Sequence, residues 1–284
     1  MVIAVYLLII LSAVTQSAAT KLFHRTCPHS AVFNAIKSLS ALIFFALIAA
    51  FGFSFHLPTL LFGLLYGSAL CLSMYAGYKA LCLGPMALTS MLISFSVMLP
   101  LLWGITVGNE QLGTLQWIAL VCLPVAIVLT NLHRPSTADT PSGSARWLLF
   151  VGTTFLCNGV CSILQKQHQT LYPQAQAREF MLYAMLLASV AFTVAALRKL
   201  SPRRLWEARG KAFGVLSGVA NGLANLLTLV LAGMENASVL FPIISLGTIL
   251  ASLLCGRLFF RERLRVNHYL ALAVGGVAVV LLKL

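Results

Sequence analysis

Residues 101–129 read LLWGITVGNEQLGTLQWIALVCLPVAIVL, and residues 253–281, which start 152 positions later, read LLCGRLFFRERLRVNHYLALAVGGVAVVL. Without any gap, the two stretches carry the same residue at eleven positions. Matches of Leu and Val are expected in apolar stretches, whereas a shared glycine and a shared glutamate are not: Gly104 with Gly256, and Glu110 with Glu262. The chain therefore contains an internal repeat, which is typical of membrane folds built from two related halves.

The composition is that of a protein surrounded by lipid. Hydrophobic residues make up 60% of the 284 positions and charged residues only 9%, whereas about 25% of the residues of a soluble protein are charged. The acidic residues all lie in or beside breaks between apolar runs, as expected if the runs are membrane spans: Glu110, Asp139, Glu179, Glu207, Glu235 and Glu262. This composition excludes a soluble globular fold, and we expect membrane lipid to surround the chain.

The net charge of +13 does not indicate nucleic-acid binding. The basic residues are spread over short connections between apolar runs, which is the pattern of cytoplasmic loops in membrane proteins. We therefore expect no nucleic acid among the partners of this chain.

Ten apolar segments are long enough to span a bilayer, which takes about 20 residues in a helix. They are 2–20, 30–51, 59–80, 85–107, 114–132, 147–166, 179–199, 212–233, 237–259 and 266–283. The longest connection, 133–146, is rich in Pro, Ser and Thr, and we expect it to be a linker. The sequence therefore predicts an all-α polytopic membrane protein, with a first five-helix repeat in 1–132 and a second in 147–284.

Five is an odd number, so the two halves enter the membrane in opposite directions. The predicted fold is therefore ten transmembrane helices arranged as two inverted five-helix repeats. Fifteen of the 19 Lys and Arg residues fall in the connections on one side, and the positive-inside rule assigns that side to the cytoplasm. We accordingly expect both termini outside the cytoplasm, in a plasma membrane, the inner membrane of a bacterium.

The ends of the two halves carry a recognisable pattern. It consists of an apolar helix with an early proline, then Glu-x-Leu, then a final helix with a glycine. The second half follows it at Ala237, Pro242, Glu262, Leu264 and Gly276, and the first half at Ala87, Glu110 and Leu112, with Ser90 and Pro124 in place of the proline and the glycine. With its ten segments, the chain resembles the drug/metabolite transporter superfamily, in particular the EamA-like branch, over nearly its whole length.

The resemblance implies a ten-span carrier or efflux protein, and it says little about the substrate. Members of that family usually have both termini in the cytoplasm, whereas the Lys and Arg count of this chain predicts the opposite. We expect the orientation that the count predicts, because the count belongs to this chain.

Polar side chains within the apolar segments are the candidate substrate-binding residues, because an amide or hydroxyl in hydrocarbon needs a partner. Asn221 and Asn225 lie four positions apart and therefore share one face of a helix. The other neutral candidates occupy five further segments: Gln16, Tyr75 with Tyr78, Ser94, Asn158, and Ser245 with Thr248. Each such face either lines a cavity or joins helices, since polar contacts between membrane helices contribute about 0.6 kcal/mol on average.

Three charged residues have two interpretations each. Lys37 lies seven residues into the segment 30–51; its ammonium group either binds an anion or extends along the helix to the membrane surface. Glu110 and Glu262 each precede the start of a helix, where the helix dipole favours a carboxylate. We therefore expect structural roles for the two glutamates rather than proton transport.

These features favour a transporter that moves a small-molecule substrate, a metabolite or drug-like solute, by alternating access between two halves. An intramembrane enzyme needs a nucleophile with a base, or a set of metal ligands, and neither the six histidines nor the seven cysteines form such a set. We expect no catalytic residue, no cofactor and no metal. Two alternatives stay open, a nucleotide-sugar or phosphate-type anion exchanger of the same superfamily and a non-transporting membrane scaffold, as does the oligomeric state.

Overall fold

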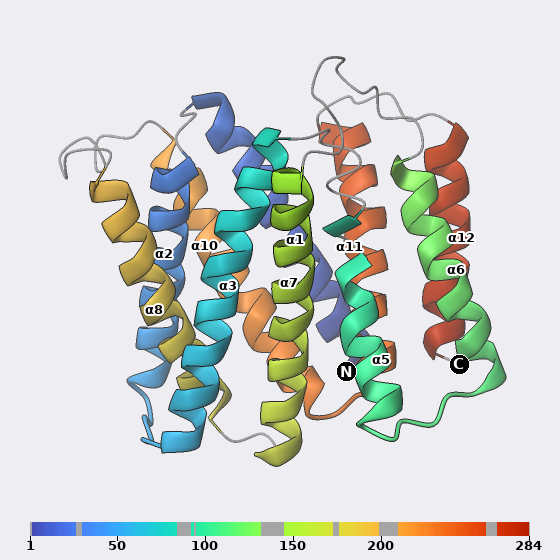
Figure 1. Ribbon diagram of the computed structural model, residues 1–284, viewed down its shortest axis with the longest axis horizontal. Helices are drawn as coiled ribbons and strands as arrows, with labels where there is room; N and C mark the ends of the chain where they lie inside the picture. The colour runs from blue at the N-terminus through green and yellow to red at the C-terminus, as the bar shows by residue number, and fades with distance from the viewer. Residues whose placement is uncertain are drawn as a thin grey trace. The chain divides into compact units, whose positions relative to one another are not determined.

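The computed structural model describes residues 2–26, 30–83, 92–93, 95–131, 145–172, 176–198, 210–259 and 266–283. Every regular element in these ranges is a helix, so the predicted all-α class is confirmed for the described part of the chain (Figure 1). The elements are α1 (Val2–Thr26), α2 (Ser30–Ala49), α3 (Leu57–Leu83), the 3-10 helix η1 (Phe95–Val97), α5 (Met98–Thr106), α6 (Thr114–Asn131), α7 (Ala145–Leu171), α8 (Ala177–Leu197), α10 (Lys211–Ala232), α11 (Ala237–Phe259) and α12 (Val266–Lys283).

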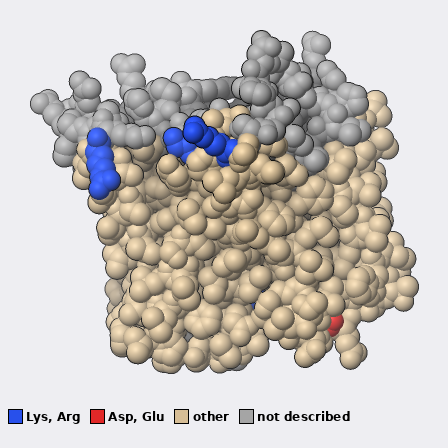
Figure 2. Space-filling view, viewed as in Figure 1, with Lys and Arg blue, Asp and Glu red and all other residues tan. Residues whose placement is uncertain are grey.

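Six helices are long and apolar enough to cross a membrane. They are Val2–Ala19 of α1, Ala31–Ala49 of α2, Leu57–Gly77 of α3, and the whole of α7, α8 and α10. Four further apolar stretches in the described residues are shorter, and they lie in η1 with α5, in α6, in α11 and in α12. The face shown in Figure 2 carries few charged side chains among the described residues. The structure thus supports a membrane protein, whereas ten spans in two inverted repeats stay a prediction.

The predicted segments coincide with helices, with two differences. α1 and α7 continue to Thr26 and Leu171, beyond the predicted ends at 20 and 166. Helical hydrogen bonds join backbone groups and do not require apolar side chains, so both helices run on into polar residues. The predicted segment 85–107 appears as η1 and α5 in its second half, and its residues 85–91 and 94 lie outside the described residues.

The chain forms two compact units, each built from two separate stretches of the sequence. Unit 1 consists of Met1–Cys71 and Leu164–Gly233, and unit 2 of Leu72–Ile163 and Met234–Leu284. α3 and α7 therefore each contribute their first part to one unit and their second part to the other. The compact units differ from the predicted halves 1–132 and 147–284. The predicted halves describe the sequence repeat and not which helices pack together, and they stay a prediction. Most of the predicted linker 133–146 lies outside the described residues.

In unit 1, α1 and α2 both pack against α10, and α2 also packs against α8. The α2–α10 contact depends on a stripe of small residues on α10, Gly214, Gly218 and Gly222. A Cβ atom on Gly218 would overlap the carbonyl oxygen of Lys37 and lie 2.7 Å from Cβ of Ser40. Only glycine lets the two backbones approach this closely.

A pair of glycines on α3 makes the same kind of contact in unit 1. A Cβ atom on Gly63 of α3 would lie 2.9 Å from the carbonyl oxygen of Phe180, and one on Gly67 would lie 2.9 Å from that of Ala184, both in α8. Gly63 and Gly67 recur 151 positions later as the first two members of the α10 stripe. The close approach of α3 to α8 thus parallels that of α10 to α2.

In unit 2, α12 packs against α6 and α11, and α11 also packs against α5 (Figure 1). The two copies of the sequence repeat lie in these helices, the first in α5 and α6 and the second in α11 and α12. Each helix of the first copy therefore packs against the corresponding helix of the second. The buried apolar residues of this packing include Leu101, Leu123, Ile127, Leu246 and Ala271.

We predict that Gly218→Ala lowers the free energy of unfolding by about 1–3 kcal/mol, the usual cost of overpacking a close contact. The new methyl group has to push α2 away from α10, because the atoms that it meets include backbone. Thermal unfolding in detergent measures the effect. Gly152→Ala in α7 is the matched control, since a Cβ atom there would meet nothing within 4 Å. Equal stability of the two variants would contradict the close contact.

Candidate functional site

Four polar side chains from α3, α7 and α10 meet inside unit 1. The Tyr66 hydroxyl donates to Oδ1 of Asn225 at 2.9 Å, and Nδ2 of Asn225 donates to Oδ1 of Asn221 at 3.1 Å. Nε2 of Gln165 lies 3.4 Å from Oδ1 of Asn225 and 3.5 Å from the Tyr66 hydroxyl. We call these four residues the amide cluster.

The amide cluster lies within helices that are otherwise apolar. Tyr66, Gln165 and Asn221 are buried, and Asn225 is half-buried. A buried amide or hydroxyl costs several kcal/mol unless it is hydrogen-bonded, which explains why these side chains are directed toward one another. The predicted shared face of Asn221 and Asn225 is confirmed by their hydrogen bond. Tyr66 was not predicted, because a tyrosine in an apolar run has the same sequence pattern as a core residue.

Two helices of the amide cluster, α3 and α7, also carry a polar pair within unit 2. The Ser73 hydroxyl donates to Oδ1 of Asn158 at 2.6 Å. Ser73 follows Tyr66 by seven residues, and Asn158 precedes Gln165 by seven. Seven residues make about two helical turns, so each helix returns to the same side. The predicted candidate Asn158 thus bonds to Ser73, which is 85 positions away in the sequence and could not be predicted from the residues around Asn158.

A second polar group in unit 1 centres on Thr59, which is fully buried. Its hydroxyl donates to Oε1 of Gln176 at 2.6 Å and lies 3.0 Å from Nδ1 of His56 and 3.1 Å from Nε2 of His168. A hydroxyl has one proton and two acceptor positions, so both imidazole nitrogens donate to it. Nδ1 of His168 is then the acceptor for Nε2 of Gln169, 3.1 Å away. This network assigns the Nε2–H tautomer to His168.

The start of α8 is held to the segment after α2 by a buried carboxylate. Glu179 is fully buried, and its Oε1 accepts the Ser54 backbone N–H at 3.3 Å. The neighbouring Arg178 donates to the carbonyl oxygen of Gly52 at 3.0 Å and lies 3.8 Å from Glu179 Oε1. Among the described residues, Glu179 Oε2 and the Tyr183 hydroxyl have no hydrogen-bond partner. Glu179 looks like a boundary residue in the sequence, and only the structure places it in the interior.

Glu110 joins the two copies of the repeat in unit 2. Its Oε1 accepts the Ala237 backbone N–H at 2.7 Å, and its Oε2 accepts the Ser238 backbone N–H at 2.9 Å. Glu110 therefore caps the N-terminus of α11, whereas the sequence placed it before its own next helix, α6. A Cβ atom on Gly104 would lie 2.5 Å from Glu110 Oε2, so the glycine that the repeat conserves between copies leaves room for the carboxylate. The corresponding Glu262 lies outside the described residues.

Two other predicted residues of unit 1 lie on α1 and α2, which are not the three helices of the amide cluster. Gln16 on α1 and Lys37 on α2 are both half-buried. No hydrogen bond in the described part of the chain joins Lys37 to another side chain.

The predicted residues of unit 2 are dispersed. Tyr75 is 54% exposed, and its ring contacts Phe150 and lies 6.0 Å from the Lys79 ammonium group. Ser245 and Thr248 on α11 are half-buried, and the Thr248 hydroxyl has no partner among the described residues. The Tyr78 side chain and Ser94 lie outside the described residues. No group of three or more His, Cys, Asp or Glu side chains that would hold a metal occurs in the described part of the chain.

We predict that Glu110→Ala lowers the free energy of unfolding by about 1–2 kcal/mol, as the loss of a helix cap does. Glu110→Gln loses less, because one acceptor oxygen remains for the N-terminus of α11. Thermal unfolding in detergent distinguishes the variants. Gln111→Ala is the control, because Gln111 is exposed and a surface substitution usually stays within about 0.5 kcal/mol. Wild-type stability of Glu110→Ala would refute the cap.

We also predict that Thr59→Val destabilises the protein by about 1–3 kcal/mol, the cost of leaving a buried polar partner unpaired. Valine keeps the volume and removes the hydroxyl that His56, His168 and Gln176 share. Thr153→Val is the control, because the Thr153 hydroxyl only donates to the Leu149 carbonyl of its own helix. If both valine variants unfold alike, the Thr59 network does not stabilise unit 1.

No family model matches this chain, and no curated protein matches it. Among solved structures, one described as "Crystal structure of protein" is similar to it, with a TM-score of 0.79. The two are 14% identical, and the alignment covers 98% of this chain and 94% of that chain. At this identity the similarity shows a shared fold.

Proposed function

We propose that this protein is an integral membrane transporter that carries a small organic solute, as the resemblance to the drug/metabolite transporter superfamily implies. The observation that carries the proposal is the amide cluster of Tyr66, Gln165, Asn221 and Asn225. It lies inside a unit whose helices are apolar enough to cross a membrane. Polar side chains in that setting are expensive, and they commonly mark the path of a substrate.

The chemistry of the amide cluster suits a neutral, polar solute. Amides and a phenol both donate and accept hydrogen bonds without adding charge. When a ligand binds, such groups can replace the hydrogen bonds among themselves with hydrogen bonds to the ligand at little electrostatic cost. The competing interpretation is that they only join α3, α7 and α10, as polar contacts in membranes commonly do. Binding measurements on an Asn225 variant separate the two.

The helix packing supports the proposed repeat of 1–132 with 147–284. In the predicted order of spans, α2 corresponds to α8, α5 to α11 and α6 to α12, and the members of each pair pack against each other. Helices next to a two-fold axis contact their own counterparts. The glycine pairs on α3 and α10 follow the same correspondence. Alternating access between two inverted repeats is therefore the mechanism that we propose.

Membrane and orientation complete the proposal. We infer a plasma membrane, the inner membrane of a bacterium, with both termini outside the cytoplasm. The support is the bias of Lys and Arg toward one set of connections. Reactivity of a cysteine introduced near either terminus toward an impermeant reagent tests this orientation.

An anion exchanger of the same superfamily is the second candidate, and it depends on Lys37. This lysine lies within the apolar stretch Ala31–Ala49 of α2 and is half-buried. An exchanger of sugar phosphates or nucleotide sugars would need that ammonium group to hold the anion. Binding at the amide cluster does not require a cationic group. Lys37→Met should therefore inactivate an anion exchanger, whereas Asn225→Ala should inactivate a carrier that uses the amide cluster.

We predict that one class of solute stabilises the purified protein in detergent, in a panel of amino acids, nucleosides, sugars, sugar phosphates and organic cations. A ligand at 100 times its dissociation constant adds about 2.7 kcal/mol to the folded state. Asn225→Ala should weaken binding and liposome uptake of that solute at least about tenfold, which is about 1.4 kcal/mol. The control is Ser68→Ala, because the exposed Ser68 hydroxyl only bonds the Leu65 carbonyl of its own helix.

The outcomes separate the candidates. Loss of binding in Asn225→Ala with retention in Ser68→Ala supports the amide cluster as the site. Loss in Lys37→Met, with a sugar phosphate as the stabilising solute, favours the anion exchanger instead. Binding without uptake into liposomes, or no binding by any class, favours a non-transporting scaffold.

A further inference from the structure

The connection between α2 and α3, residues 50–56, is apolar although it is not helical (Figure 1). It reads AFGFSFH, and no Asp, Glu, Lys or Arg occurs anywhere from residue 38 to residue 78. A connection that lies in water is normally rich in polar residues. The two other connections that the structure describes in full each contain a glutamate, Glu110 in 107–113 and Glu235 in 233–236. The composition of 50–56 therefore indicates a less polar environment.

The apolar side chains of this connection are exposed. Phe51 is 89% exposed and Phe55 65%, and Leu57, the first residue of α3, is 57% exposed. Phe53 lies between the two exposed phenylalanines, and its ring packs edge-to-face against Tyr183 of α8. Neighbouring exposed apolar side chains mark contact with a membrane or with a partner.

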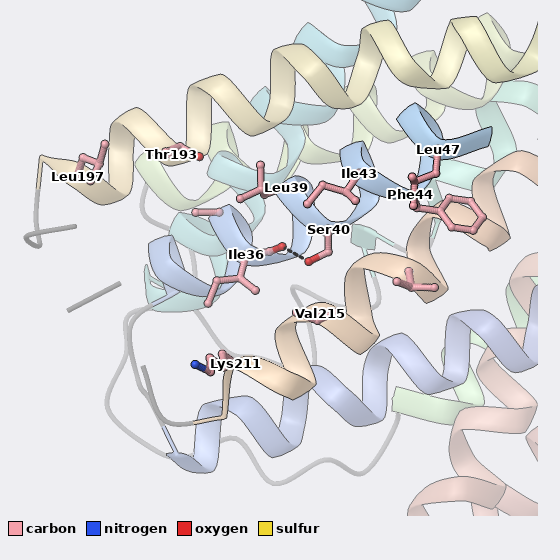
Figure 3. Close-up of a pocket in the computed structure, with 12 residues that line it drawn as sticks. Ile36, Leu39, Ser40, Ile43, Phe44, Leu47, Thr193, Leu197, Lys211 and Val215 are labelled. Atoms are coloured by element: carbon pink, nitrogen blue, oxygen red, sulfur yellow. Dashed lines mark hydrogen bonds between the residues drawn. The ribbon is translucent and has the colours of Figure 1, made fainter. Parts of the chain in front are cut away.

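The exposed side chains of the connection continue two exposed stripes on helices. On α2, Leu39, Ile43 and Leu47 are exposed at a spacing of four and line an apolar groove of unit 1 (Figure 3). Phe51 is the next position at that spacing. The exposed leucines at the start of α3 have the same spacing: Leu57, Leu61 and Leu65. Both stripes lie on stretches that are long and apolar enough to cross a membrane, so the connection extends a surface that faces lipid.

The backbone of the connection bonds to the first turn of α8. Gly52 has φ 135°, a conformation that favours glycine, and its carbonyl oxygen accepts a hydrogen bond from Nη2 of Arg178 at 3.0 Å. The Ser54 N–H donates to Oε1 of Glu179 at 3.3 Å, and Glu179 is fully buried. Residues 52 and 54 thus hold the connection to the protein, while the exposed phenylalanines alternate with them.

These hydrogen bonds are what a connection in an apolar environment requires. A backbone N–H or carbonyl group that water does not reach needs a partner within the protein. For a connection in water, solvent supplies the partner, and a fully buried carboxylate beside it would be an unnecessary cost. Arg178 and Glu179 supply one donor and one acceptor to the connection. An apolar setting of the connection therefore explains why a glutamate is buried at the start of α8.

We propose that the connection 50–56 lies in the bilayer interface and extends Phe51 and Phe55 into the acyl chains, while the first turn of α8 bonds its backbone. The partner is the acyl region of membrane lipid, so no particular headgroup is required. A protein partner at Phe51 would have to displace lipid from the α2 stripe that this residue continues. The inference is independent of transport, and it stands whether or not the amide cluster binds a solute.

The first test measures the depth of the two phenylalanines. Full-length protein carrying Phe51→Trp or Phe55→Trp is placed in phosphatidylcholine nanodiscs, and the emission that the substitution adds to that of the four natural tryptophans is recorded. Lipids with brominated acyl chains should quench most of the added emission, and iodide in the water should quench little of it.

Gln111→Trp is the control for depth, because Gln111 is exposed and lies in the polar connection 107–113. Iodide should quench its added emission more than brominated lipid does. Strong iodide quenching at Phe51 and Phe55 would place the connection in water and overturn the proposal. Resistance of both positions to iodide and to brominated lipid would also overturn it, because another protein surface would then cover them.

The second test addresses the first turn of α8. Glu179→Ala removes the acceptor of the Ser54 N–H, so water has to replace it, and iodide quenching in Phe51→Trp should increase. Glu235→Ala is the matched control, since it removes a glutamate from another connection and should leave that quenching unchanged. Equal quenching with and without Glu179→Ala would refute the part that α8 has in the proposal.

Discussion

A polar side chain inside an apolar bundle needs a protein partner, and this constraint decides how α3 packs against α7. Thr59 and Tyr66 on α3 find partners on α7 within unit 1, and Ser73 does so within unit 2. The three α3 residues are seven positions apart, so one side of the helix is polar at every second turn while the rest is apolar. The register of α3 against α7 follows from these hydrogen bonds, because sliding either helix by one turn would leave several buried groups unpaired.

The second organising contact is the close approach of backbones at glycine. Gly214, Gly218 and Gly222 bring α10 against one side of α2, and Gly63 and Gly67 bring α3 against α8. Close contact on one side of a helix leaves room on another. α2 contacts α10 through Lys37 and Ser40, whereas its residues Leu39 and Ile43 are exposed. The same helix therefore packs closely on one side and is exposed on another.

Much of the fold was predictable from the sequence. Helices followed from apolar runs, because each run is long enough to need internal hydrogen bonds throughout. The pairing of Asn221 with Asn225 followed from a spacing of four. Both predictions depend only on residues that are close together in the sequence.

What could not be predicted depends on contacts far apart in the chain. Thr59 meets His168 across 109 positions, and Glu179 meets Ser54 across 125. Each lies near the end of an apolar run, where polar residues normally face the membrane surface and carry no further signal. Glu110 was placed correctly at a helix start, but the helix is α11 rather than α6. Only the register between helices decides such partners, and no periodicity in a single sequence encodes it.

The cap that Glu110 provides has a consequence for how the chain is made. Its partner Ala237 lies 127 positions downstream. At a synthesis rate of about 5–20 residues per second, roughly 6–25 seconds pass before α11 exists. Throughout that interval the nascent first copy of the repeat holds a carboxylate whose two main-chain donors have not yet been made. While the early helices insert into the membrane, Glu110 must therefore stay within reach of water or another temporary hydrogen-bond donor until the start of α11 has been synthesised.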